Sequence, residues 1–241
     1  MKINILSPHI DDAGYCLALT IAKCANSKMQ ITVINCFTVT KWAIRFVSKD
    51  INEISLLRKN EDIEFYKSYQ FPINIVNLDL LDAPLRSGFI FQEKPFEEKE
   101  WQVVNSLKKY LENHLDGLLF CPLGLGNHVD HAICREAVLQ LYDKMKVLFF
   151  EDLPYANRLG EAGILAHVHD LQTRLNAHLL NRTDGLHQCT INKEQAIRLY
   201  KTQLNDQICS EIIDHMNLLS GERIWGEAEV IEEFNDCLVC N

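Results

Sequence analysis

Short apolar runs alternate with longer amphipathic segments along the chain. The apolar runs are rich in β-branched and aromatic residues and predict strands over 2–6, 30–38, 73–80, 116–121 and 146–150. The segments between them place apolar residues at helical spacing and predict helices over 14–26, 52–70, 96–114 and 131–144. From about residue 157 the pattern becomes mainly helical, with one interruption near 187–191.

This alternation predicts an α/β fold of the Rossmann-like type. Strands joined through helices form right-handed crossovers, which produce a parallel sheet with helices on both faces. We expect the strand order 3-2-1-4-5, followed by a mainly helical C-terminal part. The sequence has no repeat, no low-complexity tract and no Pro/Gly-rich linker, so we expect a single domain over residues 1–241.

Composition and charge exclude several classes of partner. The chain is 47% hydrophobic with a net charge of −9 and no basic run, which argues against a nucleic-acid partner. No apolar stretch approaches the length of about 20 residues that a bilayer requires. The apolar N-terminal run stops at Ser7-Pro8, too early for a signal peptide, and we expect a cytoplasmic protein. The sequence leaves open whether the chain forms a homo-oligomer.

The nine cysteines agree with a reducing compartment. Their number is odd and most lie in apolar segments, where a free thiol behaves as a small buried hydrophobe. Cys237 and Cys240 form a C-x-x-C pair at the C-terminus without a second ligand pair at a fitting spacing. We predict two ordinary thiols there, and a redox or metal role stays open as the alternative.

Two polar clusters follow predicted strands at their carboxyl ends. The first strand leads into Ser7-Pro8-His9-Ile10-Asp11-Asp12, and the fourth leads into a Gly-rich turn that ends in His128-Val129-Asp130-His131. In open α/β sheets the binding site lies at this edge, where the strand order reverses. Strands one and four are neighbours across that reversal, so both clusters should face one crevice.

The two clusters contain the groups needed to hydrolyse an amide. His9, Asp12 and His131 provide two imidazoles and one carboxylate, a catalytic zinc shell with a position left open for water. Zinc lowers the pKa of that water towards ~7 and polarises a carbonyl. A carboxylate beside the metal can take the proton of the water, and a protonated histidine can stabilise the oxyanion or protonate the leaving amine. The groups that remain for these tasks are Asp11, His128 and Asp130.

Each cluster alone has a simpler interpretation. An Asp-Asp pair before a helix is often a cap, and a His-x-Asp-His run in a Gly-rich turn can be a solvated loop. Their occurrence after two strands predicted to be adjacent favours the metal site.

The two motifs resemble those of the PIG-L/LmbE-like deacetylases, which read Pro-His-Pro-Asp-Asp-Glu and His-Pro-Asp-His. Weaker similarities extend over most of the chain, at Arg58-x-x-Glu61, Leu81–Arg86, Glu151–Tyr155, Lys193–Tyr200 and Gln203. The resemblance implies zinc, or another divalent metal, held by His9, Asp12 and His131. It also implies Asp11 as general base, His128 as acid or oxyanion stabiliser, and Asp130 as the residue that orients His128.

The resemblance further implies a small-molecule substrate, an N-acetylated sugar or sugar conjugate that loses its acetyl group. Arg58 and Asp82 match positions that resemble the sugar-binding residues of the family, since charged groups bind hydroxyls strongly. The alternative for this pair is an ordinary surface ion pair. The loop over 83–96, with Phe89, Phe91 and Phe96, is either a lid over the pocket or a segment packed on the sheet.

Two departures from the motif keep other functions open. Ile10 replaces the second proline and Ala13 replaces the final acidic residue. Loss of that acid weakens support around the site, an effect of ~10–100-fold in related cases. One alternative is therefore a non-catalytic sugar-binding module, although an intact Asp11 argues against it. The other alternative is a metal-dependent hydrolase of a different amide.

Overall fold

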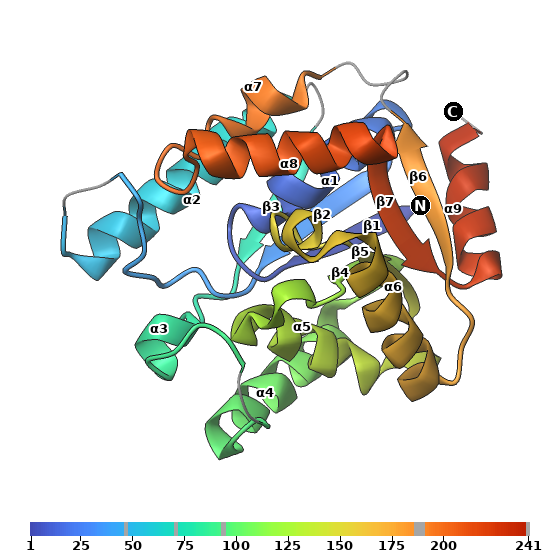
Figure 1. The fold of residues 1–241 in the computed structure, drawn as a ribbon, viewed down its shortest axis with the longest axis horizontal. Helices are drawn as coiled ribbons and strands as arrows, with labels where there is room; N and C mark the ends of the chain where they lie inside the picture. The colour runs from blue at the N-terminus through green and yellow to red at the C-terminus, as the bar shows by residue number, and fades with distance from the viewer. Residues whose placement is uncertain (46–47, 70–71, 93–94, 186–190, 240–241) are drawn as a thin grey trace.

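Seven strands form one mixed sheet in the order β3-β2-β1-β4-β5-β7-β6 (Figure 1). The structure is a computed structural model, and it describes residues 1–45, 48–69, 72–92, 95–185 and 191–239. The strands are β1 Lys2–Ser7, β2 Gln30–Asn35, β3 Ile73–Asn77, β4 Leu118–Pro122, β5 Lys146–Phe150, β6 Leu180–Gly185 and β7 Gly221–Gly226.

The five predicted strands are parallel and have the predicted order. Ile5 of β1 lies opposite Val33 of β2 on one side and Phe120 of β4 on the other, so β1 is central. The inner strands β1, β4 and β5 are mainly apolar because both of their faces are covered, whereas the edge strand β3 is only partly buried. The predicted α/β fold with the order 3-2-1-4-5 is confirmed for this part of the sheet.

The mainly helical C-terminal part needs a correction, because it adds two strands to the sheet. β7 pairs antiparallel with β5, and β6 pairs antiparallel with β7, so the sheet is mixed. The β6 sequence Leu-Asn-Arg-Thr-Asp-Gly is almost entirely polar, and β7 begins and ends with glycine. Neither segment has the apolar alternation that predicts a strand. The interruption expected near 187–191 falls largely on residues 186–190, which lie outside the described residues.

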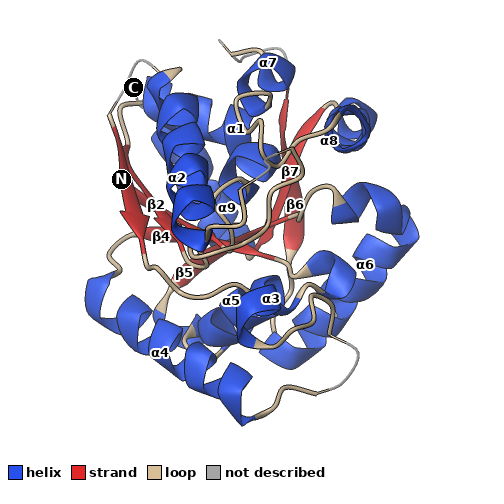
Figure 2. Cartoon of the chain, turned by 90° about the vertical axis from the view of Figure 1, so that its left-hand side faces the viewer, coloured by secondary structure: helices blue, strands red, loops and turns tan. Residues whose placement is uncertain are grey.

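Helices cover both faces of the parallel strands. Figure 2 shows α1 and α2 on one face and α4 and α5 on the other, as the βαβ connections require. The helices are α1 Asp12–Asn26, α2 Ile51–Lys67, α3 Ala83–Arg86, α4 Glu98–His114, α5 Val129–Leu139, α6 Tyr155–Leu175, α7 Lys193–Ile197, α8 Asp206–Leu219 and α9 Ala228–Val239. In the described part of the chain, none of them is long and apolar enough to span a membrane.

The helix boundaries explain how the polar clusters are positioned. α1 begins at Asp12, directly after β1 and its short connection, and α5 begins at Val129 after β4. Both helix N-termini therefore lie at the carboxyl edge of the sheet. The side chains of the two clusters are fixed to the ends of packed elements and not to long loops.

Candidate active site

A cavity of about 330 Å³ opens at the carboxyl edge of the sheet, between the loops that follow β1, β4 and β5. Its size falls within the range of about 300–1,000 Å³ that small-molecule sites occupy. Seven of the eight predicted site residues line it, whereas Asp130 lies fully buried behind them. The seven are His9, Asp11, Asp12, Arg58, Asp82, His128 and His131.

Three atoms from the two motifs form a nearly equilateral triangle in this cavity. The Nδ1 atom of His9 lies 3.1 Å from Oδ2 of Asp12, and Nε2 of His131 lies 3.3 Å from the same oxygen. The two nitrogens are 3.3 Å apart. In a tetrahedral zinc site with bonds of about 2.0–2.1 Å, neighbouring ligand atoms lie about 3.3–3.4 Å apart. The spacing of His9, Asp12 and His131 thus fits three ligands of one ion.

Each of the two histidines contacts a buried carboxylate through its other ring nitrogen. Nε2 of His9 lies 3.1 Å from Oδ2 of Asp130, and Nδ1 of His131 lies 2.6 Å from Oδ1 of Asp152. If an ion takes the place of the protons inside the triangle, each of these two carboxylates keeps a proton on the nitrogen that it contacts, and the opposite nitrogen can donate its lone pair to the ion. His9 Nδ1 and His131 Nε2 are therefore the ring atoms that would bind it.

The electrostatics of the triangle are those of a site that attracts positive charge. Burial lowers the pKa of His9, but hydrogen bonds to Asp12 and Asp130 outweigh it and raise the pKa to about 10. Burial raises the pKa of Asp12, and the charges of His131 and His9 overcome this and hold it well below its usual range. Buried carboxylates thus stabilise cations here, either as protons or as a metal ion.

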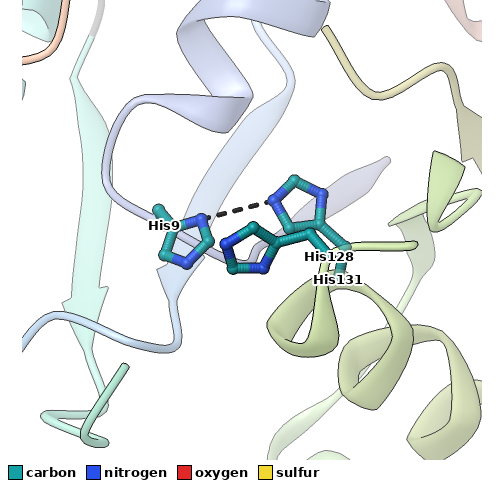
Figure 3. A group of neighbouring side chains, drawn as sticks. All are labelled: His9, His128 and His131. Atoms are coloured by element: carbon teal, nitrogen blue, oxygen red, sulfur yellow. Dashed lines mark hydrogen bonds between the residues drawn. The ribbon is translucent and has the colours of Figure 1, made fainter. Parts of the chain in front are cut away.

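Figure 3 shows a third histidine, His128, beside His9 and His131, with the dashed line joining the latter two. A ring nitrogen from each of the three lies within 4.8 Å of the others, so a three-histidine set is a second candidate for the metal. His128 already uses Nδ1 to accept the backbone N–H of Asp130 at 3.2 Å, which caps α5. The set with Asp12 is tighter and has the spacing of a tetrahedral shell.

His128 is held in its neutral form. Burial, together with the charges of His9 and His131, lowers the pKa of His128 well below its ordinary value. Because Nδ1 accepts a backbone hydrogen bond, the proton of the neutral ring is on Nε2. His128 therefore provides a hydrogen-bond donor to the cavity.

Asp11 is not a simple helix cap. It precedes α1 but makes no capping hydrogen bond through its side chain. Its Oδ1 atom instead accepts a hydrogen bond of 2.7 Å from Nη2 of Arg58, and both side chains are largely buried. Its Oδ2 atom has no hydrogen-bond partner within the described residues, so one carboxylate oxygen is fixed and the other is available in the cavity.

The two predicted sugar-binding residues have different surroundings. Arg58 lines the cavity while it is paired with Asp11. Asp82 also lines it, but Oδ1 accepts the backbone N–H of Leu85 at the start of α3, and Oδ2 accepts the hydroxyl of Thr40. The surface ion pair considered as the alternative is not what the structure contains, because both side chains are buried and they are not paired with each other.

Asp130 contacts a different histidine from the one expected. Its carboxylate accepts from Arg86 Nη2 at 2.7 Å and from the backbone N–H of Ala83 at 2.9 Å, and it contacts Nε2 of His9. Among the described residues, the hydrogen bond between Asp130 and His128 is donated by the Asp130 backbone. Within the described residues, the side chain of Asp130 therefore orients His9.

Two further residues of the site, Asp152 and Tyr155, were not among the predicted site residues, although both lie in the Glu151–Tyr155 segment that resembles the family. Asp152 follows β5 and fixes His131, and the rule that places sites at carboxyl strand ends applies to it as well. Tyr155 begins α6, lines the cavity, and packs edge-on against His131 with ring centroids 5.7 Å apart. Gly126, at φ +74°, leaves room for this ring, because a Cβ atom there would lie 2.5 Å from it.

The two residues that depart from the family motif lie next to the start of α1. Ala13 and Ile10 are both buried in the hydrophobic core. Neither replacement removes a side chain from the triangle of His9, Asp12 and His131.

The loop over 83–96 was expected either to cover the pocket or to pack on the sheet, and its described residues do some of each. Its start is helix α3, and Phe89 and Phe96 pack against the core. Phe91 instead lines the cavity and pairs with His128 through a short antiparallel bridge.

A larger hollow of about 640 Å³ lies at the opposite, amino end of the strands. Its charged side chains are already paired: Lys144 with Glu112, Lys146 with Glu233, and Asp116 with the neighbouring Lys2. None of the described residues that line it is a histidine, so the chemistry is concentrated in the smaller cavity.

A comparison with protein families identifies the family of the chain. The family model described as "PIG-L: GlcNAc-PI de-N-acetylase" matches residues 4–142, which is more than half of the chain and includes both motifs. The chain belongs to the PIG-L family. A comparison with curated protein sequences finds no significant match.

Solved structures share the PIG-L fold over nearly the whole chain. A deacetylase of teicoplanin biosynthesis, solved as a bog complex, has a TM-score of 0.69 at 18% identity and covers 93% of this chain and 97% of its own. The zinc inhibited form of teicoplanin deacetylase has a TM-score of 0.67 at 17% identity, covering 93% and 97%. The N,N'-diacetylchitobiose deacetylase of Pyrococcus horikoshii has a TM-score of 0.54 at 16% identity, covering 93% and 82%.

Proposed function

We propose that this chain is a metal-dependent deacetylase that removes an acetyl group from the amine of an N-acetylated amino sugar or sugar conjugate. The observation that carries the proposal is the triangle of His9 Nδ1, Asp12 Oδ2 and His131 Nε2, with sides of 3.1–3.3 Å. The family match and the deacetylases of similar fold support the type of reaction. The zinc inhibited form of one of them supports a divalent metal.

His9, Asp12 and His131 would hold the ion, and Asp130 and Asp152 would fix the two imidazole rings. A bound zinc ion, or another divalent metal, supplies Lewis acidity to the amide carbonyl and to a water molecule. A neutral imidazole and a carboxylate are ligands that zinc accepts.

Asp11 has the geometry of a general base. Arg58 holds one carboxylate oxygen at 2.7 Å and thereby fixes the orientation of the other towards the cavity. A water molecule beside Asp11 can transfer a proton to that oxygen while it attacks the amide carbon. Arg58 is then a positioning residue, and its contact with the sugar stays a prediction alongside that of Asp82.

His128 and Tyr155 are suited to stabilise the oxyanion. The neutral His128 presents its Nε2–H to the cavity, as its Nδ1 bond to the Asp130 backbone requires. Burial and the charges of Asp12 and Asp11 raise the pKa of Tyr155 above its ordinary value, so the phenol keeps its proton and can donate as well. Donors fixed before the reaction stabilise the developing negative charge without reorganisation.

The test compares Asp11→Asn with wild type on a panel of N-acetylated sugars, with released acetate as the readout. The account predicts nearly unchanged metal content and a loss of hydrolysis of ~10²–10⁴-fold, the usual contribution of a general base. Asp116→Asn removes an exposed carboxylate far from the cavity and serves as the matched control. Unchanged turnover in Asp11→Asn would contradict the assignment of the base.

The same panel separates the two alternatives. Sugar binding without turnover in wild type would favour the non-catalytic binding module. Turnover of a different class of amide, with none for N-acetyl sugars, would favour the other hydrolase.

A further inference from the structure

Three large apolar side chains are left exposed at the mouth of the cavity. Trp42 is 53% exposed, Phe91 48% and Ile44 39%, and all three line the same cavity as His9 and His131. Single exposed apolar residues are common on protein surfaces and need no explanation. Their gathering around one concave site is typical of a binding surface. We refer to Trp42, Ile44 and Phe91 as the apolar rim.

The backbone that carries Trp42 and Ile44 is anchored on both sides. The N–H of Trp42 donates to the hydroxyl of Thr40 at 3.0 Å, and its carbonyl accepts from Nε2 of Gln203 at 3.0 Å. The N–H of Ile44 donates to the carbonyl of Thr202 at 2.7 Å. These bonds hold the two side chains at the mouth before any ligand binds, which lowers the entropic cost of binding.

Phe91 is anchored from the opposite motif. It forms an antiparallel bridge with His128, supported by hydrogen bonds from Gln92 N to Asn127 O and from Val129 N to Ile90 O. Its ring lies edge-on to His128 and Tyr155, with centroids 6.1 Å and 6.4 Å away. The apolar rim is therefore tied directly to the catalytic groups.

The charges of the cavity do not favour an anion at the mouth. Among the described residues that line it, the arginines are Arg58 and Arg158. Arg58 is paired with Asp11, and Arg158 makes two hydrogen bonds, of 2.9 and 2.6 Å, to Glu211. A phosphate group would need donors that these carboxylates already occupy. Lys41 and Arg45 are exposed on either side of the rim segment but do not line the cavity.

We propose, as an extension that rests on the proposed function, that the apolar rim selects sugars linked to an uncharged aromatic or aliphatic group. The acetylated sugar occupies the inner cavity, and its aglycone packs between Trp42 and Phe91 at the mouth. Such a substrate carries no phosphate next to the sugar, so a sugar 1-phosphate represents the opposite case. Stacking and burial of an aromatic aglycone against these side chains supply the selectivity.

The experiment compares kcat/KM for three N-acetylglucosamine derivatives: the phenyl glycoside, the methyl glycoside and the 1-phosphate. We expect kcat/KM for the phenyl glycoside to be higher than that for the methyl glycoside by roughly tenfold or more, because the ring buries apolar area. The kcat/KM for the 1-phosphate should not be higher than that for the methyl glycoside. In Trp42→Ala and in Phe91→Ala, the phenyl-to-methyl ratio should fall to within about threefold.

Trp101→Ala is the matched control, since Trp101 is also exposed, at 39%, but lies on α4 and does not line the cavity. Its phenyl-to-methyl ratio should equal that of wild type. A phenyl-to-methyl ratio near one in wild type overturns the proposal, and so does a wild-type ratio that is unchanged in both Trp42→Ala and Phe91→Ala. A preference for the 1-phosphate that Lys41→Ala or Arg45→Ala removes also overturns it.

Absence of turnover for all three derivatives contradicts the proposed deacetylase and calls for a binding readout. Calorimetric titration with the phenyl and methyl glycosides then tests the rim alone. Tighter binding of the phenyl glycoside that is lost in Trp42→Ala supports the rim, and equal binding of both overturns it.

Discussion

Among the described residues, two clusters of buried charge differ in how completely their groups are paired. In the first cluster, the carboxylate of Glu222 on β7 accepts a hydrogen bond from Lys193 at 2.8 Å. It also accepts from the backbone N–H groups of Leu19 and Thr20 on α1 and from the Thr20 hydroxyl. At the carboxyl edge, ring nitrogens of His9 and His131 converge on Oδ2 of Asp12, and this group of atoms needs a cation, either protons or a metal ion, to balance the carboxylate. The first cluster is complete without a ligand, whereas the second is complete only when a cation joins it.

Two consecutive residues after β5 illustrate this difference. Asp152 contacts His131 and belongs to the candidate metal centre. Glu151 contacts His215 and Trp225 and is paired with Arg223, within the packing between α8 and β7. Successive side chains of an extended segment point in opposite directions, so neighbouring carboxylates reach different clusters. Burial of a charge therefore indicates function only when its partners remain incomplete.

The largest effect is expected where the complete cluster is broken. Lys193→Met leaves Glu222 buried without its cation and should lower the free energy of unfolding by about 3–5 kcal/mol. Metal content of the folded protein should stay the same. Urea denaturation measures the loss, and Lys146→Met, which breaks an exposed pair with Glu233, should cost less than about 1 kcal/mol. Equal losses of unfolding free energy in both variants would show that the buried pair of Lys193 and Glu222 matters no more than an exposed pair.

A second prediction concerns Asp62, a buried carboxylate whose hydrogen bonds come from the neutral side chains of Tyr200 and Asn35. Burial raises the pKa of Asp62 to about 7, and these hydrogen bonds offset the effect only in part. The folded protein thus keeps a proton that the unfolded chain releases near its ordinary pKa of about 3.9. The stabilisation is complete below that value and is lost as the pH rises to about 7.

The test of this prediction compares wild type with Asp62→Asn by urea denaturation between pH 4.5 and 7.5. The free energy of unfolding of wild type should fall relative to the variant, by up to roughly 1.4 kcal/mol for each pH unit. Parallel pH profiles would show that the carboxyl of Asp62 is ionised throughout.

A smaller effect is expected from the orientation of His131. Asp152→Asn replaces its carboxylate partner and should weaken metal binding by ~10–100-fold, measured by competition with a chelator. Glu151→Gln changes the adjacent residue, whose carboxylate is paired with His215, Arg223 and Trp225. It should leave metal affinity unchanged and reduce stability by about 1–3 kcal/mol. A loss of metal affinity in the Glu151 variant would contradict the separation of the two neighbours.

The sequence predicted the parallel part of the fold well because most of its strands, β1, β2, β4 and β5, are largely buried. Continuous apolar runs such as those of β4 and β5 have few other interpretations once helices separate them. β6 could not be predicted in this way, since it is an edge strand with mostly polar side chains. Its pairing with β7 is a long-range contact that local periodicity does not encode.

For the site, the sequence located the residues better than their partners. The edge rule brought His9, Asp12 and His131 to one cavity, as predicted. The contact between Asp130 and His9 depends on side-chain directions at the start of α5, and the sequence contains no such information. Asp152 could have been assigned by the same rule, because it follows the carboxyl end of β5.

The central claim is that His9, Asp12 and His131 hold a metal ion while His128 remains outside the ligand set. Elemental analysis of wild type, His9→Ala, His131→Ala and His128→Ala, purified alike, tests it most directly. We expect about one divalent ion per chain in wild type and in His128→Ala, and strong depletion in the other two variants. Full metal content in His9→Ala or His131→Ala, or depletion in His128→Ala as severe as in His131→Ala, would contradict it.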